Sequence, residues 1–186
     1  MPRIIIIGQP GSGKSTLARR LGEATGIPII HIDRIHWQPN WQERSQDEKT
    51  RLCLAAEAQE HWIFEGGHAA TWANRVARAD LLIWLDRAPA LRFWRALKRT
   101  LKGRGHTRPD LPDHCPERLR NLPGFFRFMW TTRHSARNKM QQLVSTAPDH
   151  CRVVHLRSDR DVEAFLAASD GAAPGALRSS VQTLAK

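Results

Sequence analysis

The stretch GQPGSGKS, residues 8–15, follows an apolar run and precedes a segment with helical periodicity. It matches the pattern Gly-x4-Gly-Lys-[Ser/Thr] in full, through Gly8, Gly13, Lys14 and Ser15. Glycines at these positions allow backbone N–H groups to turn inward around phosphate oxygens, and the N-terminus of the following helix adds a positive dipole. The stretch therefore predicts a binding site for a nucleoside triphosphate.

The side chains of this phosphate loop indicate separate roles toward ATP. Lys14 is expected to reach the β- and γ-phosphates, and the Ser15 hydroxyl to contact Mg²⁺. The residues predicted to hold ATP are Gly8, Gly11, Ser12, Gly13, Lys14, Ser15, Thr16 and Arg157. A dinucleotide site is the nearest alternative, because Asp33 follows where a ribose-binding acid would lie. Lys14 and Ser15 argue against it, since that site needs close helix packing at those positions.

Apolar runs alternate with segments of helical periodicity along the rest of the chain. The predicted strands are 3–8, 27–33, 61–67, 79–86 and 151–158. The predicted helices are 14–26, about 45–60, 71–79, about 89–102, about 125–146 and 159–169. This alternation predicts an α/β fold with a parallel sheet, helices on both faces and right-handed crossovers, with the site at the carboxyl ends of the strands. We expect one domain over residues 1–170 and a disordered tail over 171–186.

Acidic residues follow two of the predicted strands. Asp33, at the end of the second strand, is expected to accept a proton from an acceptor hydroxyl or to hold Mg²⁺ through water. Glu65, at the end of the third, is placed to hold the Mg²⁺ shell, and Gly66 and Gly67 allow close approach of a substrate. The alternative for Asp33 is a helix cap or a surface ion pair, and for Glu65 a turn acid facing solvent.

The net charge is confined to the middle of the chain. The whole chain carries +11, and residues 87–139 hold 14 Lys/Arg against 3 Asp/Glu, which is also +11. Basic residues recur at helical spacing in this segment, namely Arg92, Arg95, Lys98, Arg99 and Lys102. We predict that Arg95 and Arg99 assist phosphoryl transfer, and that the Gly/Pro-broken stretch at about 100–124 is a lid.

A nucleic-acid surface and a merely solvated basic face are the alternatives for the same segment. The neighbouring aromatic residues Phe125, Phe126, Phe128 and Trp130 have a spacing that favours burial in the core over a stacking platform. A zinc site at His106, His114 and Cys115 lacks a Cys-x-x-Cys partner pair.

Composition favours a cytosolic protein. The three cysteines are far apart and odd in number, which favours reduced thiols over a disulfide framework. Apolar runs are shorter than the roughly 18 residues of a membrane span, and IIII is too short for a signal-peptide core. The expected partners are therefore ATP and a small molecule, without a membrane; the oligomeric state is left open.

Six stretches together resemble one family of P-loop proteins. They are GSGKSTLARRLG (11–22), IDRIHWQPNW (32–41), HWIFEGG (61–67), ADLLIWLDRAPALRFWRALKR (79–99), HTRPDLPDHCPER (106–118) and RVVHLRS (152–158). The chain is similar over roughly residues 3–168 to the adenylate-kinase-like proteins labelled DNA-topology-modulation (FlaR-related) proteins. This resemblance implies a P-loop kinase fold with a five-stranded parallel sheet in the order 2-3-1-4-5 and a lid.

The sequence departs from that family after the third strand. Members typically carry Asp-Gly-Asn-Tyr, where this chain has Glu65, Gly66, Gly67 and His68. We expect a phosphotransferase of the nucleoside or nucleotide kinase class that uses ATP and Mg²⁺, with Ser15 and Glu65 at the metal. The acceptor is expected to contact Asp33, Trp37, Glu65, Gly66, Gly67 and His68. A nucleotide-regulated DNA-binding protein is the alternative function.

Overall fold

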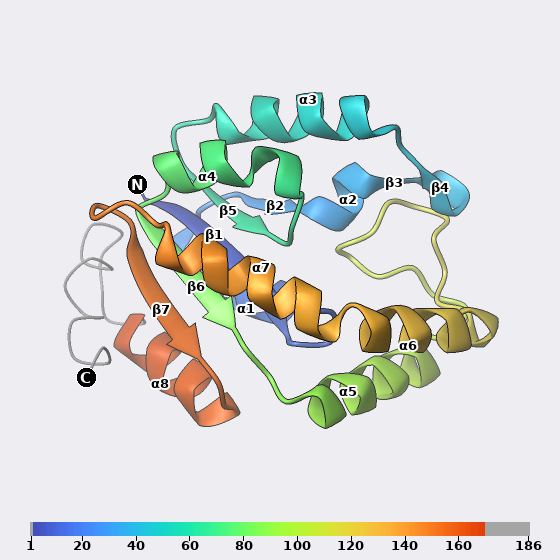
Figure 1. The fold of residues 1–186 in the computed structure, drawn as a ribbon. Coiled ribbons are helices and arrows are strands. Elements are labelled where there is room, and N and C mark those ends of the chain that lie inside the picture. The colour runs from blue at the N-terminus through green and yellow to red at the C-terminus, as the bar shows by residue number, and fades with distance from the viewer. Residues whose placement is uncertain (1, 170–186) are drawn as a thin grey trace.

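The apolar run at the N-terminus forms β1 (Arg3–Gly8), the middle strand of a parallel sheet in the computed structural model, which describes residues 2–169 (Figure 1). The other strands of this sheet are β2 (Ile29–His31), β5 (Trp62–Glu65), β6 (Leu81–Leu85) and β7 (Arg152–Leu156). The order across the sheet is β2-β5-β1-β6-β7. It corresponds to the predicted order 2-3-1-4-5 when the two short strands of a separate hairpin are not counted.

Both faces of the sheet are covered by helices, as predicted. The helices are α1 (Lys14–Thr25), α2 (Ile32–His36), α3 (Gln46–Glu57), α4 (Trp72–Arg78), α5 (Pro89–Lys102), α6 (Leu122–Thr131), α7 (Arg133–Ser145) and α8 (Asp159–Ser169). Short 3-10 turns cover Pro39–Trp41, Ala69–Thr71 and Leu119–Asn121. Among residues 2–169 there is no helix with the length and apolar character to cross a bilayer.

The isoleucines of β1 supply both halves of the core, because successive side chains of a strand point to opposite faces. Ile4 and Ile6 pack with the apolar faces of α1 and α8. Ile5 and Ile7 pack with residues of α3, α4 and α7. A strand buried on both faces needs an unbroken apolar run, which is what the sequence shows.

The second predicted strand is too long in two directions. Only Ile29–His31 pairs with β5, and the chain turns into α2 at Ile32. Asp33 therefore lies in the first turn of this short helix and not at a strand end. Its negative charge there interacts favourably with the positive N-terminus of the helix. The tryptophan-rich loop after it forms a hairpin of β3 (Trp37–Gln38) and β4 (Gln42–Glu43).

The predicted helix over 125–146 is two helices, α6 and α7, that meet at Thr132. The hydroxyls of Thr131 and Thr132 both donate to the carbonyl of Phe128, at 3.2 and 2.7 Å. Such bonds compete with the backbone ladder and interrupt helices. Residue 123 is a proline near the N-terminus of α6, a position where its missing N–H is harmless, so the helix begins earlier than predicted. The predicted tail, 171–186, lies outside the described residues.

Candidate active site

The phosphate loop lies between β1 and α1 and contains two glycines in the left-handed region. Gly11 has a φ of 77° and Gly13 a φ of 97°. Gly13 directly precedes α1, which has no side-chain cap, so the first backbone N–H groups of the helix keep hydrogen-bonding capacity. This arrangement is the anion-binding concavity that the motif predicts.

Helix α5 packs directly against this loop. A Cβ at Gly11 would overlap the backbone carbonyl of Arg92, so this position requires glycine for space as well as for conformation. From the next turn of α5, the Arg95 guanidinium donates to the backbone carbonyl of Ser12 at 3.2 Å. The basic helix and the phosphate loop are thus parts of one site.

Arg95 is held at the loop by an acid from the other end of the chain. Its Nη2 contacts both carboxylate oxygens of Asp159 at 2.7 Å, and Arg87 reaches the same carboxylate at 2.9 Å. Asp159 begins α8, just after β7. The sequence singled out Arg95 but gave no reason to pair it with Asp159.

Glu65 connects the phosphate-loop lysine to β2. The Lys14 Nζ lies 3.6 Å from Glu65 Oε1, and the His31 Nδ1 lies 2.9 Å from Oε2. The parallel register of β2 and β5 places His31 directly opposite Glu65. Glu65 is only 3% exposed, so both contacts form in a poorly hydrated setting where charge interactions are strong.

Asp33 faces the same space from α2. Its carboxylate lies 3.8 Å from the Arg108 guanidinium, and 42% of its side chain is exposed, into the cleft described below. Partial desolvation of the carboxyl group within the cleft and the negative charge of Glu65 raise the pKa of Asp33, and this outweighs the opposing effect of Lys14 and Arg108. A carboxylate with a raised pKa is better suited to accept a proton than an ordinary one.

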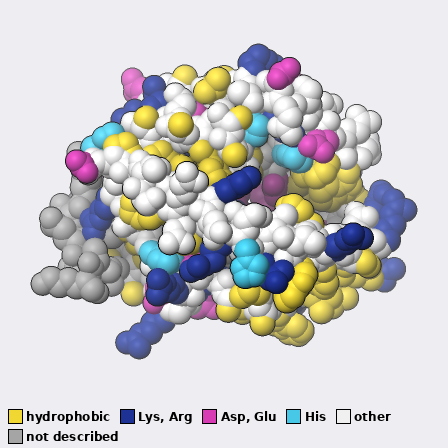
Figure 2. All heavy atoms as spheres, viewed as in Figure 1, with side chains coloured by type: hydrophobic (Ala, Val, Ile, Leu, Met, Phe, Trp, Pro, Cys, Tyr) yellow, Lys and Arg dark blue, Asp and Glu magenta, His cyan; other side chains and the backbone are white. Residues whose placement is uncertain are grey.

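These groups line one cleft of about 1490 Å³, which is larger than the roughly 300–1,000 Å³ of a typical single-ligand site. Figure 2 shows the hollow near the centre of the displayed face, with an acidic side chain recessed in it and Lys/Arg side chains near its rim. Of the predicted residues, the cleft is lined by Gly8, Gly11, Ser12, Gly13, Lys14, Ser15, Thr16, Asp33, Trp37, Glu65, Gly66, Gly67, Arg95 and Arg99.

Two predicted residues do not line the cleft. The His68 Nε2 forms a hydrogen bond of 2.8 Å with the Thr50 hydroxyl on α3. Arg157 is exposed in the turn after β7, where its backbone N–H donates to Asp161. Their roles toward acceptor and adenine therefore stay predictions without a contact that supports them.

Arg99 reaches the cleft by a different route from Arg95. Its Nε lies 3.2 Å from Glu117, and its guanidinium lies over the Phe125 ring at 5.6 Å from the ring centroid. Glu117 also accepts from Thr100 at 3.0 Å and pairs with Arg108 at 2.9 Å. The predicted catalytic arginine is thus bound to an acid of the predicted lid.

Several cleft residues were not predicted as site residues, although some belong to stretches that the resemblance singled out. Asp110 and Glu117 belong to RPDLPDHCPER, and Trp41 to HWQPNW. Because no periodic pattern links these loops to the strand ends, only the folded chain brings them together. Phe128 and Trp130, expected in the core, are 51% and 55% exposed, so that expectation is wrong for these two residues.

Oxygen donors from the start of α1, from α2, from the end of β5 and from the α5–α6 loop suit magnesium. Ser15, Asp33, Glu65 and Asp110 present oxygen atoms, the ligand type that Mg²⁺ prefers, usually with one or two carboxylates plus substrate phosphates. Within residues 2–169, His, Cys, Asp and Glu form no group of three or more arranged to hold a metal by themselves. The buried Ser12 hydroxyl has no hydrogen-bond partner within this range, so the loop keeps a side-chain donor beside its N–H groups.

Comparison with known proteins points to one class of enzyme, the kinases. No protein-family model matches the chain. Shikimate kinase of Symbiobacterium thermophilum is 29% identical over 136 residues, which are 64% of this chain and 75% of that enzyme. Shikimate kinase of Mycobacterium tuberculosis is 47% identical over 32 residues, 17% of this chain and 18% of that enzyme.

Solved structures share the fold at low sequence identity. Shikimate kinase from Acinetobacter baumannii in complex with shikimate has a TM-score of 0.51 at 17% identity, and the match covers 88% of each chain. Deoxyadenosine kinase from M. mycoides has a TM-score of 0.54 at 16% identity, covering 91% of this chain and all of that one. The chain has the P-loop kinase fold. With the sequence matches, this fold supports a P-loop kinase enzyme whose acceptor is unspecified.

Proposed function

We propose that this P-loop kinase transfers the γ-phosphate of ATP to a hydroxyl group of a small acceptor. The observation that carries the proposal is the shared cleft, in which the phosphate loop and Asp33 face one space large enough for two ligands. The relatives are kinases of small molecules, which agrees with an acceptor of that size.

ATP is proposed to bind with its phosphates on residues 8–16. Backbone N–H groups, Lys14 and Arg95 would compensate the phosphate charge, and phosphoryl transfer depends mainly on such positioning and electrostatics. When bound, Mg²⁺ would neutralise phosphate charge there, held by Ser15 with Glu65 nearby. Three buried free thiols agree with a proposed location in the cytosol.

The acceptor is proposed to lie between α2, the β3–β4 hairpin and the turn after β5. Asp33 would accept the proton of the attacking hydroxyl, which its raised pKa favours. Gly66, with a φ of 101°, leaves no room for a side chain because a Cβ would overlap Ile32. Arg75 donates to the Gly66 carbonyl and steadies this wall.

The test is a phosphate-transfer screen with γ-labelled ATP against nucleosides, nucleoside monophosphates, hydroxylated acids and sugars. A labelled product that depends on enzyme and on Mg²⁺ supports the proposal, and its identity defines the acceptor class. ATP binding without transfer to any class, and without hydrolysis, would contradict it.

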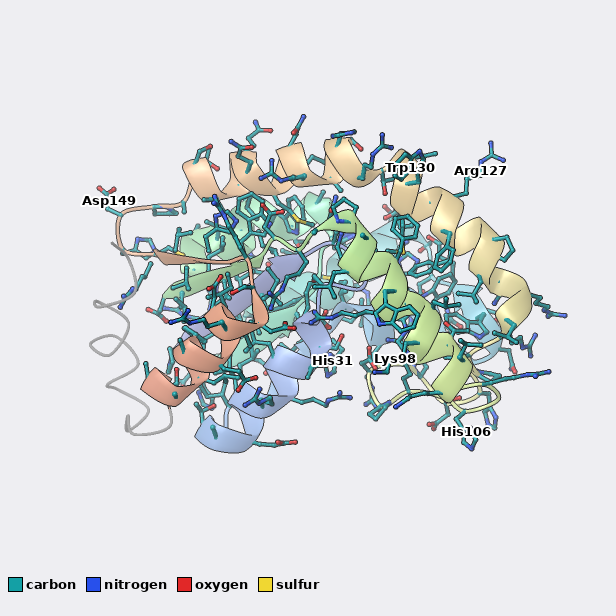
Figure 3. The ribbon with its side chains drawn as sticks, turned by 90° about the horizontal axis from the view of Figure 1, so that it is seen from below. His31, Lys98, His106, Arg127, Trp130 and Asp149 are labelled. Carbon is teal, nitrogen blue, oxygen red and sulfur yellow. The ribbon has the colours of Figure 1, made fainter. Side chains whose placement is uncertain are left out.

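A second candidate function rests on the basic surface. Six cations around α5 and α6 are exposed and make no ion pair within the described residues: Lys98, Lys102, Arg104, Arg118, Arg120 and Arg127. Figure 3 shows Lys98 on α5 and Arg127 at the outer edge of α6. Together with the exposed Trp94 and Trp130 they suit a nucleic-acid backbone and its bases, so a nucleotide-regulated DNA-binding protein is retained as the alternative.

A further inference from the structure

A buried histidine ends β2, close to the lysine of the phosphate loop (Figure 3). His31 is 8% exposed, and the register of the sheet pairs it with Glu65 of β5. Ile29 and Ile63, two residues earlier on each strand, are paired in the same way and pack into the core that α1 covers. Because side chains two residues apart point to one face of a strand, His31 and Glu65 also face α1, which begins at Lys14.

Glu65 has two partners, one on each carboxylate oxygen. The Nδ1 of His31 lies 2.9 Å from Oε2, which is the length of a good hydrogen bond. The Nζ of Lys14 lies 3.6 Å from Oε1, which is longer than a hydrogen bond, so this contact is a looser ion pair. His31 is therefore the close partner of the carboxylate, and Lys14 is the partner that can leave.

The burial of Glu65 makes the histidine necessary once the lysine leaves. Glu65 is 3% exposed, and a buried carboxylate without a compensating partner is strongly disfavoured. When Lys14 turns to the phosphates of a nucleotide, Glu65 keeps the donor from His31. Without this donor, release of Lys14 would deprive the buried carboxylate of both partners, so the lysine would be held back on Glu65.

We propose that His31 is a positioning residue that donates from Nδ1 to Glu65 and so allows Lys14 to exchange this carboxylate for the phosphates of a nucleotide. The inference rests on the proposed function, since it concerns the lysine and the acid of that site. His31 itself touches no nucleotide, and its effect passes through Glu65 to Lys14.

The proton of this hydrogen bond must lie on the histidine. An ionised carboxylate only accepts hydrogen bonds, whereas an imidazole nitrogen donates only when it carries the proton. A bare Nδ1 would turn its lone pair toward Glu65 Oε2 and repel it. The protonation state of one named atom is therefore a consequence that can be measured directly.

The test measures nucleotide affinity rather than activity. A fluorescent ATP analogue is titrated into the full chain and its His31→Leu variant, once in EDTA and once in MgCl₂. Under each condition in which the parent binds, we expect His31→Leu to weaken binding by about 10- to 100-fold, the effect of leaving a buried charged acceptor without its partner. His134→Leu, an exposed histidine on α7, is the matched control and should bind within about twofold of the parent.

His31→Asn separates the hydrogen bond from the bulk of the side chain. The amide nitrogen of asparagine is bonded to Cγ, as Nδ1 of histidine is, so this variant can still donate to Glu65. We expect it to recover binding to within about threefold of the parent. A role in core packing alone predicts the reverse order, because asparagine is smaller and more polar than leucine.

Two further measurements separate positioning from a folding defect. In a Glu65→Gln background the neutral amide needs no compensating charge, so adding His31→Leu should change the affinity by less than about twofold. Nitrogen-15 NMR of the parent should show His31 with a proton on Nδ1, and this signal should shift when the analogue binds. The NMR readout needs no variant.

The outcomes distinguish the two proposals. A parent that binds the analogue under neither condition contradicts the proposed function. A parent that binds it while His31→Leu keeps full affinity, or while Nδ1 of His31 carries no proton, overturns the role of His31 alone. A loss in His31→Leu that persists in Glu65→Gln, or that His31→Asn does not recover, also overturns it.

Discussion

Two cations at the phosphate loop, Lys14 and Arg95, each face a carboxylate. The Lys14 ammonium faces Glu65 at 3.6 Å, and Arg95 faces Asp159 at 2.7 Å. A phosphate group entering the loop must therefore compete with carboxylates for the same cations. Charged hydrogen bonds to phosphate are strong enough to replace these ion pairs. They stabilise the transition state where negative charge moves during phosphoryl transfer.

Lys14→Ala is expected to abolish phosphoryl transfer, because the phosphate loop has no other cation that could neutralise negative charge on the transferring phosphoryl group. The expected loss in kcat is at least about 10³-fold, comparable to that of a phosphate-stabilising arginine. Labelled phosphate transfer to the best acceptor measures it, with the exposed Lys98→Ala as control. Turnover within a factor of ten of the parent would remove the phosphate loop from the mechanism.

Asp33→Asn is expected to lower kcat by about 10²- to 10⁴-fold, the usual contribution of a general base, with little change in ATP affinity. The pH profile gives an independent check. Because the pKa of Asp33 is raised above 3.8, the parent should lose kcat/KM on the acid side at a higher pH than an ordinary carboxylate would allow. A variant with the parent's kcat would show that Asp33 is structural.

The same substitution is expected to stabilise the fold at pH 7. A carboxyl with a raised folded-state pKa binds its proton more tightly when folded, so the charged form destabilises the protein above that pKa. Removing the charge should raise Tm at pH 7, and the gain should shrink as pH falls and the parent becomes protonated. Thermal unfolding at pH 7 and pH 4 measures this, and Asp113→Asn should show neither effect.

At the scale of elements, helix α5 combines two functions on different faces. One face packs Arg92 and Arg95 against the phosphate loop and Arg99 against Glu117 of the loop between α5 and α6. The other presents Trp94 and Lys98 to solvent. A helix that contacts both the phosphate loop and the α5–α6 loop can transmit a change from one to the other.

Arg95→Ala is expected to lower kcat by about 10³-fold or more, as loss of an arginine at a transferring phosphate does. Lys98→Ala, one turn farther along the same helix and exposed, is the matched control and should keep kcat within about twofold. The measurement is steady-state transfer at saturating ATP. Equal, small effects in both variants would indicate that α5 does not take part in the reaction.

Helices α3 and α4 are joined by a buried ion pair that also supports the site. Arg75 and Glu57 are both 0% exposed and lie 2.9 Å apart, and Arg75 also donates to the Gly66 carbonyl. Glu57→Gln would leave the Arg75 charge buried without compensation, which is expected to lower the free energy of unfolding by about 3–5 kcal/mol. Urea unfolding measures it, with the exposed Glu60→Gln as control at under about 0.5 kcal/mol. An equally small effect at Glu57 would show that the pair is not needed for the fold.

At the scale of the whole molecule, residues 87–139 carry the net positive charge, and the rest of the chain is neutral. Of the 3 acids in residues 87–139, Asp110 and Glu117 are buried in ion pairs with arginines, so Asp113 alone is exposed. The outer surface of α5, of the loop that follows it and of α6 therefore carries an excess of positive charge. Such a surface attracts anions in general, and their identity depends on contacts.

The kinase proposal predicts weak, non-specific DNA binding by this surface, with Kd in the range of about 10⁻⁴–10⁻⁶ M at physiological salt. Salt-titrated binding to duplex DNA measures it in the parent and in Lys98→Ala/Lys102→Ala. Nanomolar binding at physiological salt that these substitutions weaken, with transfer unchanged, would favour the DNA-binding alternative for this segment.

Several features could be predicted from local pattern alone. The four isoleucines of β1 and the glycines of the phosphate loop each have an environment that follows from their own neighbours in sequence, because a doubly buried strand needs a continuous apolar run and an anion-binding turn needs glycine. The strand order and the helical face of α5 follow similarly from spacing and from the resemblance. Lys14, Arg95 and Glu65 lie in one cleft for these reasons.

Only the tertiary structure decided which distant groups meet. Arg95 pairs with Asp159, and Arg108 reaches Asp33, across loops whose sequences have no periodic signal. The prediction that Asp33 ends a strand is wrong, because the apolar residues of a short strand and of the first turn of a following helix look alike in sequence. Local pattern reports burial and backbone conformation, whereas the partner of a charge depends on the fold that brings separate segments together.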